Sequence, residues 1–234
     1  MPRPRNIDNR VETAEQIKAL ARQQLAERGT NGISLRGIAR EMGITAPAIY
    51  NYFPRLDDLI TALLVDAFSG HAEAIEKAIA SHDDARTQLQ AGLHAYRDWA
   101  LAHPADFTLI YGNPIPSYDA PREITVPLAA RPQEALMRCL IRAQEAQQLR
   151  IPARYQNVPV TIHQHISRFL YRDFPEVQAV PNHMALFYLM EVGWARAHGI
   201  VMLEIHGHLG PTLGDTDTFY QQALEAYLDE IGIS

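Results

Sequence analysis

Apolar residues recur every three or four positions through the first half of this sequence, which is the spacing of an amphipathic α-helix. Glycine or proline follows several of these stripes, and both residue types commonly end helices. The predicted helices cover residues 11–28, 35–42, 46–53, 56–79, 84–103 and 104–111. This part of the chain is therefore expected to be helical throughout.

Prolines interrupt the pattern in the second half of the chain. Five prolines fall within residues 112–132, a density that predicts a long irregular segment of the kind that is often functional. Helical spacing then returns, with a break at Gly210-Pro211 before the last stretch. The later predicted helices cover residues 132–147, 160–172, 183–206 and 216–231. Because no run alternates with the two-residue period of a β-strand, the fold is predicted to be all-α.

Two of these predicted helices are short and are joined by a turn that contains Gly43, a residue type that helices favour just past their ends. Ser34 is placed to cap the first helix and Thr45 the second, whose first turn holds Pro47. Two short helices with such a turn, supported by a preceding helix, predict a helix-turn-helix. The second helix of that motif enters the major groove of DNA.

The residue identities around this motif point to one family. Residues 34–59 carry Ile-Ala, then Gly, then Tyr-x-Tyr-Phe, and then a new helix that contains Leu. The matching residues are Ile38, Ala39, Gly43, Tyr50, Tyr52, Phe53 and Leu59. The segment thereby resembles the DNA-binding domain of the TetR (tetracycline-repressor) family. The resemblance implies an all-α protein with an N-terminal three-helix helix-turn-helix domain, residues 1–55, and a larger helical ligand-binding and dimerisation domain, residues 56–234.

Several side chains of the motif have the chemistry for DNA contacts. The phenol groups of Tyr50 and Tyr52 suit phosphate oxygens, and Thr45 offers a hydroxyl and helix-cap amides. Asn51 can pair with an adenine edge, and Arg36 can meet guanine or phosphate. The predicted DNA-binding residues are Ser34, Arg36, Thr45, Ala46, Pro47, Tyr50, Asn51, Tyr52 and Arg55. Ordinary packing is the alternative for the two tyrosines.

Basic residues concentrate at the N-terminal end of an otherwise acidic chain. The net charge is −6, but residues 1–60 hold nine Lys/Arg against seven Asp/Glu, and the remaining residues hold twelve against twenty. Arg3, Arg5 and Arg10 are expected to form a mobile arm that reaches DNA or merely keeps the chain soluble. Where TetR proteins commonly carry a phosphate-binding lysine, this chain has Leu56, and the preceding Arg55 can take that role.

A helix-turn-helix of this kind reads only a half-site, so the resemblance implies a homodimer on a palindromic double-stranded operator. The last two helices form the interface in TetR proteins, and here Gly193 and Ala197 would permit close approach of helices. The predicted interface residues are Leu186, Met190, Gly193, Ala197, Val201, Phe219, Ala223 and Tyr227. A buried core within one chain is the alternative. The segment Trp194-Ala-Arg-Ala-His198-Gly199 resembles the Trp-His-Gly signature of one TetR C-terminal subgroup.

TetR regulators usually enclose a pocket for a small-molecule effector, and the resemblance implies one here, together with repression that the effector releases. The sequence does not identify the effector. The candidate pocket residues are Tyr96, Trp99, Phe107, Tyr111, Met137, His163, Phe169 and Tyr171. Each of them is also a candidate for ordinary core packing.

The remaining composition argues against several other classes of protein. The single cysteine, Cys139, excludes an intrachain disulfide, and the chain has no apolar signal segment or membrane span, so a cytoplasmic protein is expected. His163 with His165, and His206 with His208, are weak metal candidates, so no metal or cofactor is predicted. No HExxH, GxSxG, Walker or dinucleotide-binding pattern supports an enzyme. The alternative function is a helical protein-interaction module that does not bind DNA.

Overall fold

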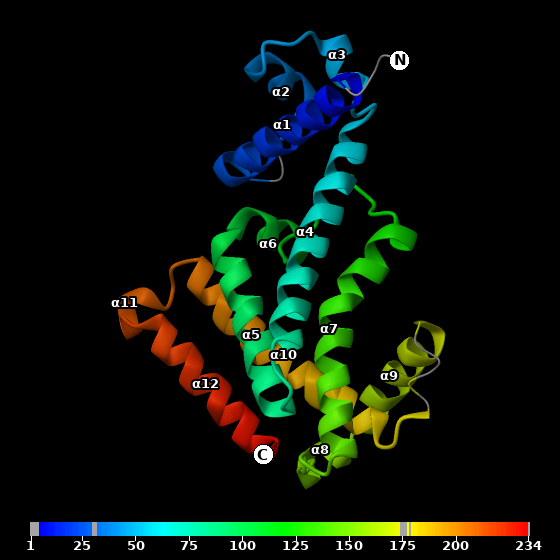
Figure 1. Cartoon of the computed structure of the whole chain (residues 1–234), viewed down its shortest axis with the longest axis vertical. Coiled ribbons are helices and arrows are strands. Elements are labelled where there is room, and N and C mark those ends of the chain that lie inside the picture. Colours follow the sequence, from blue (N-terminus) through cyan, green and yellow to red (C-terminus); the bar gives the residue numbers. More distant parts are fainter. Residues whose placement is uncertain (1–4, 30–31, 174–176, 178, 234) are drawn as a thin grey trace. The chain divides into compact units, whose positions relative to one another are not determined.

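Every regular element in the described part of the chain is a helix (Figure 1). The computed structural model describes residues 5–29, 32–173, 177 and 179–233. The helices are α1 (Arg5–Arg28), α2 (Leu35–Glu41), α3 (Ala46–Tyr50), α4 (Leu56–Ala80), α5 (Ala85–Ala102), α6 (Pro104–Tyr111), α7 (Arg122–Glu145), α8 (Ala153–Gln156), α9 (Val160–Asp173), α10 (His183–Ile205), α11 (Gly210–Leu213) and α12 (Thr216–Glu230). An isolated antiparallel bridge joins Leu149 and Ile233. The all-α class predicted from the apolar spacing is confirmed.

The helices fall into two compact units. Unit 1 comprises the described residues up to Gly70 together with Ala102–Ala129. Unit 2 comprises His71–Leu101 together with the described residues from Ala130 onward. Helix α4 therefore contributes residues to both units. The domain boundary expected after residue 55 stays a prediction.

The helix-turn-helix of unit 1 is built around one apolar core. Ile17 of α1, Ile38 of α2, Ile49 of α3 and Leu59 of α4 are fully buried in the same cluster. Burial of a side chain of this size contributes about 1.5–3 kcal/mol relative to its exposure to water. Each short helix is thus held by the core rather than by its own length, since isolated helices this short are unstable in water.

Local chemistry sets the ends of the two short helices. Ser34 Oγ accepts a hydrogen bond from the Gly37 amide at 3.0 Å, which confirms the predicted cap of α2. Gly43 follows α2 with a φ of 67°, a left-handed conformation that favours glycine. Thr45 is the N-cap residue of α3, although its side chain makes no capping hydrogen bond. Pro47 lies in the first turn of α3, as predicted.

Helix α1 begins earlier than its apolar stripe predicts. The stripe starts at Val11, whereas the helix starts at Arg5. The intervening residues are mostly polar, so they add no apolar signal, but none of them is a proline or glycine that would stop a helix. Arg5 and Arg10 therefore lie in a helix rather than in the predicted mobile arm, and Arg3 lies outside the described residues.

The prediction of an irregular segment over residues 112–132 is wrong for its second half. Helix α7 runs through Pro127 and Pro132, so only residues 112–121 are non-helical. Each proline removes one backbone hydrogen bond donor from the helix. The turns that follow bury apolar side chains such as Leu136, and such packing supplies most of the stability of a helix in a protein.

Two other prolines begin short helices that the sequence does not predict. Pro211 lies in the first turn of α11, where a break is expected, and Pro152 is the N-cap residue of α8. Proline suits these places because its fixed φ fits the start of a helix and its missing N–H has no partner there.

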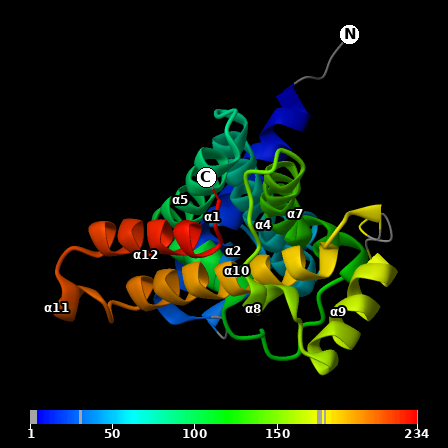
Figure 2. The same cartoon turned by 90° about the horizontal axis from the view of Figure 1, so that it is seen from below.

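In unit 2, helices α10 and α12 run side by side (Figure 2). The hydroxyl of Tyr227 on α12 donates to the Leu189 carbonyl of α10 at 2.8 Å. Gly193 makes this approach possible, because a Cβ at that position would lie 2.4 Å from Tyr227 Oη. The glycine is therefore required by packing within the chain itself.

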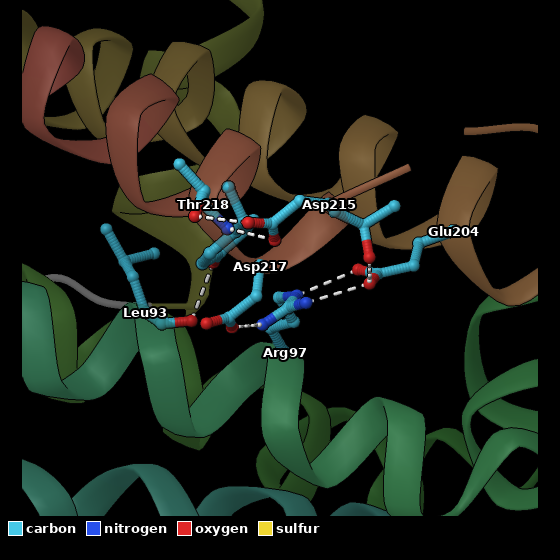
Figure 3. A network of polar contacts seen from close by, with 8 residues as sticks. Leu93, Arg97, Glu204, Asp215, Asp217 and Thr218 are labelled. Carbon is cyan, nitrogen blue, oxygen red and sulfur yellow. Dashed lines mark hydrogen bonds and ion pairs between the residues drawn. The ribbon is translucent and has the colours of Figure 1, made fainter. Parts of the chain in front are cut away.

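A buried arginine joins α5 to α10 and α12 in unit 2 (Figure 3). Nε and Nη2 of Arg97 donate to the two carboxylate oxygens of Glu204, each at 2.8 Å. Nη1 of Arg97 donates to Asp217 at 2.7 Å, and the guanidinium lies 5.1 Å from the centre of the Tyr220 ring. The two parallel bonds to Glu204 orient α5 relative to α10, and the single bond to Asp217 adds a contact with α12.

Candidate functional site

Helix α3 presents an exposed face made of residues that are predicted to contact DNA. Ile49 points into the core and is fully buried, which leaves Pro47, Tyr50 and Asn51 exposed. Ala46 is half-buried at the start of the helix. A short helix with one buried anchor and a polar opposite face has the form of a helix that enters a DNA groove.

The other predicted DNA-binding residues lie on α2, at its N-cap or on the segments that flank α3. Ser34, Arg36, Thr45 and Arg55 are exposed, and Tyr52 is half-buried. Because α2 and α3 contact each other, the structure brings the predicted set onto one motif, and all nine residues keep accessible surface. Their contact with DNA stays a prediction.

Arg55 is already engaged within the chain. Its Nη2 lies 2.7 Å from Asp58 Oδ1, and its backbone amide donates to Asp58 Oδ2 at 3.0 Å. The hydrogen bond to Asp58 raises the pKa of Arg55, and the same bond lowers the pKa of Asp58. The Arg55 side chain is 71% exposed, so water screens the pair and the guanidinium can still reach a phosphate.

Two further arginines belong to this surface. Arg10 of α1 donates from Nη2 to the Asn51 carbonyl at 3.3 Å, and its guanidinium lies 5.8 Å from the centre of the Tyr52 ring. The sequence predicts Arg10 to lie in a mobile arm, whereas the structure holds it against the end of α3. Arg40 is exposed on α2, and the sequence analysis missed it although it lies four positions after Arg36 and hence on the same helix face.

The predicted effector residues are divided between the two units, and their role in one pocket stays a prediction. Phe107 and Tyr111 lie in unit 1 with their ring centres 5.0 Å apart. The other six belong to unit 2, where Tyr96 and Met137 are buried. The members on α9 are instead exposed, namely His163, Phe169 and Tyr171.

Unit 1 contains a cleft of about 310 Å³ that none of these eight residues lines. Its walls come from α4, α6, residues 112–121 and the first turns of α7. Sequence reasoning missed this site because it selected aromatic residues inside predicted helices. The available signal was the proline-rich segment itself, which the sequence analysis recognised as a candidate functional loop.

Trp194 and His198, two members of the Trp-His-Gly segment, stack in unit 2 with ring centres 5.0 Å apart. His198 Nδ1 and the Tyr96 hydroxyl are 2.7 Å apart and share a hydrogen bond. His71 packs against Tyr96, and burial, followed by the nearby His198, lowers the pKa of His71 to about 3. Burial also lowers the pKa of His198, which is half-buried, so both histidines are expected to be neutral at neutral pH.

Most of the residues predicted for the dimer interface pack inside the chain. Leu186 and Val201 have no exposed surface, so they have none to lose to a partner chain. Gly193 serves the contact with Tyr227 of the same chain. The remaining predicted residues are Met190 and Ala197, which are buried, Ala223, which is half-buried, and Phe219, which is 36% exposed. Gly193 thus serves the chain's own packing, and the part that these residues play in a dimer interface stays a prediction.

The histidine-rich segments give no metal-binding geometry in the described part of the chain. No cluster of three or more His, Cys, Asp or Glu side chains with the geometry to hold a metal ion is found there. The rings of His206 and His208 lie 6.3 Å apart after the end of α10. Among the described residues, no helix is both long enough and apolar enough to cross a membrane.

Two family models match this chain, one in its N-terminal part and one in its C-terminal part. Residues 17–63 match the model described as bacterial regulatory proteins of the tetR family. Residues 89–227, more than half of the chain, match the tetracyclin repressor-like C-terminal domain. The chain belongs to the TetR family. The resemblance seen in residues 34–59 is thereby confirmed, and its fold expectation with it.

Curated relatives of this TetR chain are transcriptional regulators rather than enzymes. The HTH-type transcriptional regulators Rv1816 of Mycobacterium tuberculosis and Mb1846 of Mycobacterium bovis are each 39% identical to it over 134 residues. These matches cover 53% of this chain and 56% of each relative, so the chain spans about half the length of the curated relatives it matches.

Solved structures share the TetR fold along nearly the whole chain. The regulatory protein SCO4313 is 29% identical with a TM-score of 0.77, and the match covers 98% of this chain and 100% of that one. The TetR family transcriptional regulator PfmR from Thermus thermophilus is 18% identical with a TM-score of 0.60, over 93% of this chain and 97% of its own. RolR, solved with the ligand resorcinol, is 16% identical with a TM-score of 0.52, over 97% of this chain and 91% of its own.

Proposed function

We propose that this TetR chain is a DNA-binding transcriptional regulator that reads its operator with α3. The observation that carries the proposal is the outward face of that helix, where Pro47, Tyr50 and Asn51 are exposed opposite the buried Ile49. Tyr50, Tyr52 and the flanking cations would hold phosphates, because such contacts position a reader without selecting sequence. Asn51 would select an adenine edge.

A regulator of this kind acts as a homodimer on a palindromic operator. One helix-turn-helix contacts a half-site, so two copies related by a two-fold axis are needed for a full site. Because the inner faces of α10 and α12 are used within the chain, the proposed interface is formed by their exposed residues. Leu203 on α10 is 46% exposed and Phe219 on α12 is 36% exposed. Gly199 adds an open surface, since a Cβ there would meet no atom within 4 Å.

The proposed regulation is repression that a small molecule relieves, in the cytoplasm. This proposal follows the tetracyclin repressor-like description of residues 89–227. We also place the chain in the Trp-His-Gly subgroup of TetR proteins. The stacking of Trp194 on His198, and the hydrogen bond of His198 to Tyr96, support that placement because they give the motif residues a structural role.

Selection of DNA from a random pool, followed by mobility shifts on the selected site, tests the DNA-binding proposal. Tyr50→Ala removes a hydrogen bond to a charged phosphate from each subunit of the proposed dimer. Each bond contributes about 1.5–3 kcal/mol, so affinity should fall about 10- to 150-fold per half-site. Asn51→Ala should relax selection at one base pair by about 1–3 kcal/mol. Tyr171→Ala is the matched control, because Tyr171 is exposed to a similar degree on α9.

The competing function is a helical protein-interaction module. It predicts that no sequence is enriched from the pool and that residual binding does not depend steeply on salt. Circular dichroism establishes that each variant is folded. If Tyr50→Ala and Asn51→Ala bind the selected site like wild type, the assignment of α3 as the reading helix is wrong.

A further inference from the structure

The cleft in unit 1 has the dimensions of a small-molecule site. Its volume of about 310 Å³ is at the lower end of the range of ligand pockets, roughly 300–1,000 Å³. Since a water molecule occupies about 30 Å³ of liquid, the cleft has room for a ligand on the order of ten non-hydrogen atoms. The lining includes Leu64, Phe68, Leu109, Ile115, Tyr118 and Val126.

The chain around residues 112–121 is shaped to form one wall of this cleft. Gly112 lets the chain leave α6, because a Cβ there would lie 2.4 Å from the Thr108 carbonyl oxygen. Pro114 and the prolines that follow it restrict the backbone of the segment. These restrictions reduce the backbone entropy that the segment would lose when a ligand binds.

The lining selects against charged ligands. None of the described residues that line the cleft has a charged or histidine side chain. An ionised ligand would lose its hydration there without gaining a counter-charge, which carries a large free-energy penalty. The apolar side chains of α4, α6 and α7 instead suit the face of a small ring.

Two hydroxyl oxygens in the lining are arranged as hydrogen bond acceptors. Thr61 donates its only hydroxyl proton to the Asp57 carbonyl at 2.8 Å, so in the 2.9 Å contact between Thr61 and Tyr118 the tyrosine is the donor. Tyr118 Oη, which lines the cleft, then keeps lone pairs with which to accept. Thr125 likewise donates to the Pro121 carbonyl at 3.1 Å and keeps its oxygen as an acceptor.

We propose that this cleft binds a neutral, largely apolar small molecule that carries a hydroxyl or N–H donor, and that this molecule is the effector. The second half of the proposal rests on the proposed DNA-binding function. The cleft and the helix-turn-helix belong to the same compact unit. Helix α6, which supplies Leu109, also carries Asp106, whose two carboxylate oxygens share a bifurcated hydrogen bond from Arg22 Nε of α1 at 2.9 and 3.0 Å. A ligand that prefers one position of α6 thereby biases α1 and the motif that it supports.

Three fluorescent ring compounds test the chemistry of the site on the full chain. They are 2-naphthol, which is neutral and has a donor, 2-methoxynaphthalene, which lacks the donor, and 2-naphthoate, which is an anion. In equilibrium titrations, 2-naphthol should bind about 2- to 10-fold more tightly than 2-methoxynaphthalene. 2-Naphthoate should bind about 100-fold more weakly than 2-naphthol. Equal binding of the anion would overturn the assigned ligand class.

Two substitutions on α7 locate the binding. Val126→Phe fills the cleft and should weaken 2-naphthol by at least about tenfold. Ile124→Phe is the matched control, because Ile124 is an exposed residue two positions away on the same helix and does not line the cleft. Tyr118→Phe should reduce the preference for 2-naphthol over 2-methoxynaphthalene while leaving the latter bound. Unchanged binding in Val126→Phe would place the ligand elsewhere and refute the site.

Mobility shifts with and without saturating 2-naphthol test the effector role separately. Wild type and Ile124→Phe should change their DNA affinity at least about threefold on adding the ligand, and Val126→Phe should not, since coupled sites typically differ by about 5- to 150-fold. Binding in the cleft without any change in DNA affinity would overturn the effector role. Failure of the unliganded protein to bind DNA would instead refute the proposed function, and the titrations would still decide the chemistry of the cleft.

Discussion

Replacing Arg97 by methionine should destabilise the protein more than removal of any of its exposed charges. The Arg97 side chain is 5% exposed and that of Glu204 is 10% exposed, so Arg97→Met leaves a carboxylate buried without its partner. Breaking such a pair from one side typically costs about 3–5 kcal/mol. The lost pair with Asp217 adds little to the loss of stability, because the Asp217 side chain is 79% exposed and water solvates it after the change. A loss of about 4 kcal/mol corresponds to a fall in Tm of about 12 °C for a chain of this size.

The effect should depend on pH with a defined sign. The hydrogen bonds from Arg97 hold the pKa of Glu204 below its usual 4.5 in the folded state. A carboxyl with a lowered folded-state pKa contributes stability that is fully present above its unfolded pKa and is lost as pH falls through the folded value. The stability gap between wild type and Arg97→Met should therefore be largest near neutral pH and should narrow below about pH 4.5.

Urea unfolding at a fixed protein concentration, at neutral pH and near pH 4, measures both effects. The concentration is fixed because the stability of a dimer depends on it. Arg196→Met is the matched control: Arg196 pairs with Glu230 at a more exposed position and should lose less than about 1 kcal/mol. Combining Arg97→Met with Glu204→Leu removes both charges and should recover most of the loss. A loss below about 1 kcal/mol in Arg97→Met, or no recovery in the double variant, would refute the reasoning.

Three further substitutions have defined outcomes. Gly193→Ala places a Cβ 2.4 Å from Tyr227 Oη and should lower the free energy of unfolding by about 1–3 kcal/mol, so wild-type stability would contradict the described packing. Ser34→Ala removes the cap of α2 and should cost about 1 kcal/mol in the same assay; an unchanged midpoint would show that the cap does not stabilise α2. Arg55→Ala should flatten the salt dependence of DNA binding by about one unit per subunit, or about two units for the proposed dimer, if the arginine leaves Asp58 for a phosphate. An unchanged slope would mean that it stays paired.

The elements that were predictable from sequence are those whose signals are local. Ser34, Gly43 and Pro47 act on their own turns, so their residue types alone place the ends of α2 and α3. The helical course of α7 through Pro127 and Pro132 was not predictable in this way. Those turns are stabilised by packing against other helices. The helix propensity of a single residue does not include this packing, so it cannot predict the helix.

In the candidate site, too, the features that depend on local sequence were predictable and those that depend on distant residues were not. Exposure of Tyr50 and Asn51 follows from the helical period of α3, in which Ile49 takes the buried position. The apolar stripe on α10, by contrast, has the same sequence pattern whether it packs in the core of its own chain or against a second chain. In the structure Leu186 is fully buried within the chain. Arg97 and Glu204 are 107 positions apart in the sequence. The residues around each of them therefore do not predict that the two form a pair.

The wall that residues 112–121 provide has an evolutionary consequence. Segments without regular hydrogen bonding accept new side chains, insertions and deletions with little damage to the framework that carries them. Asn113 and Pro114 border the cleft and are exposed, so exchange at these two positions would alter what the proposed effector site recognises while the buried helices stay intact. A regulator of the proposed kind would thereby change the chemical that it detects while keeping the same DNA reader.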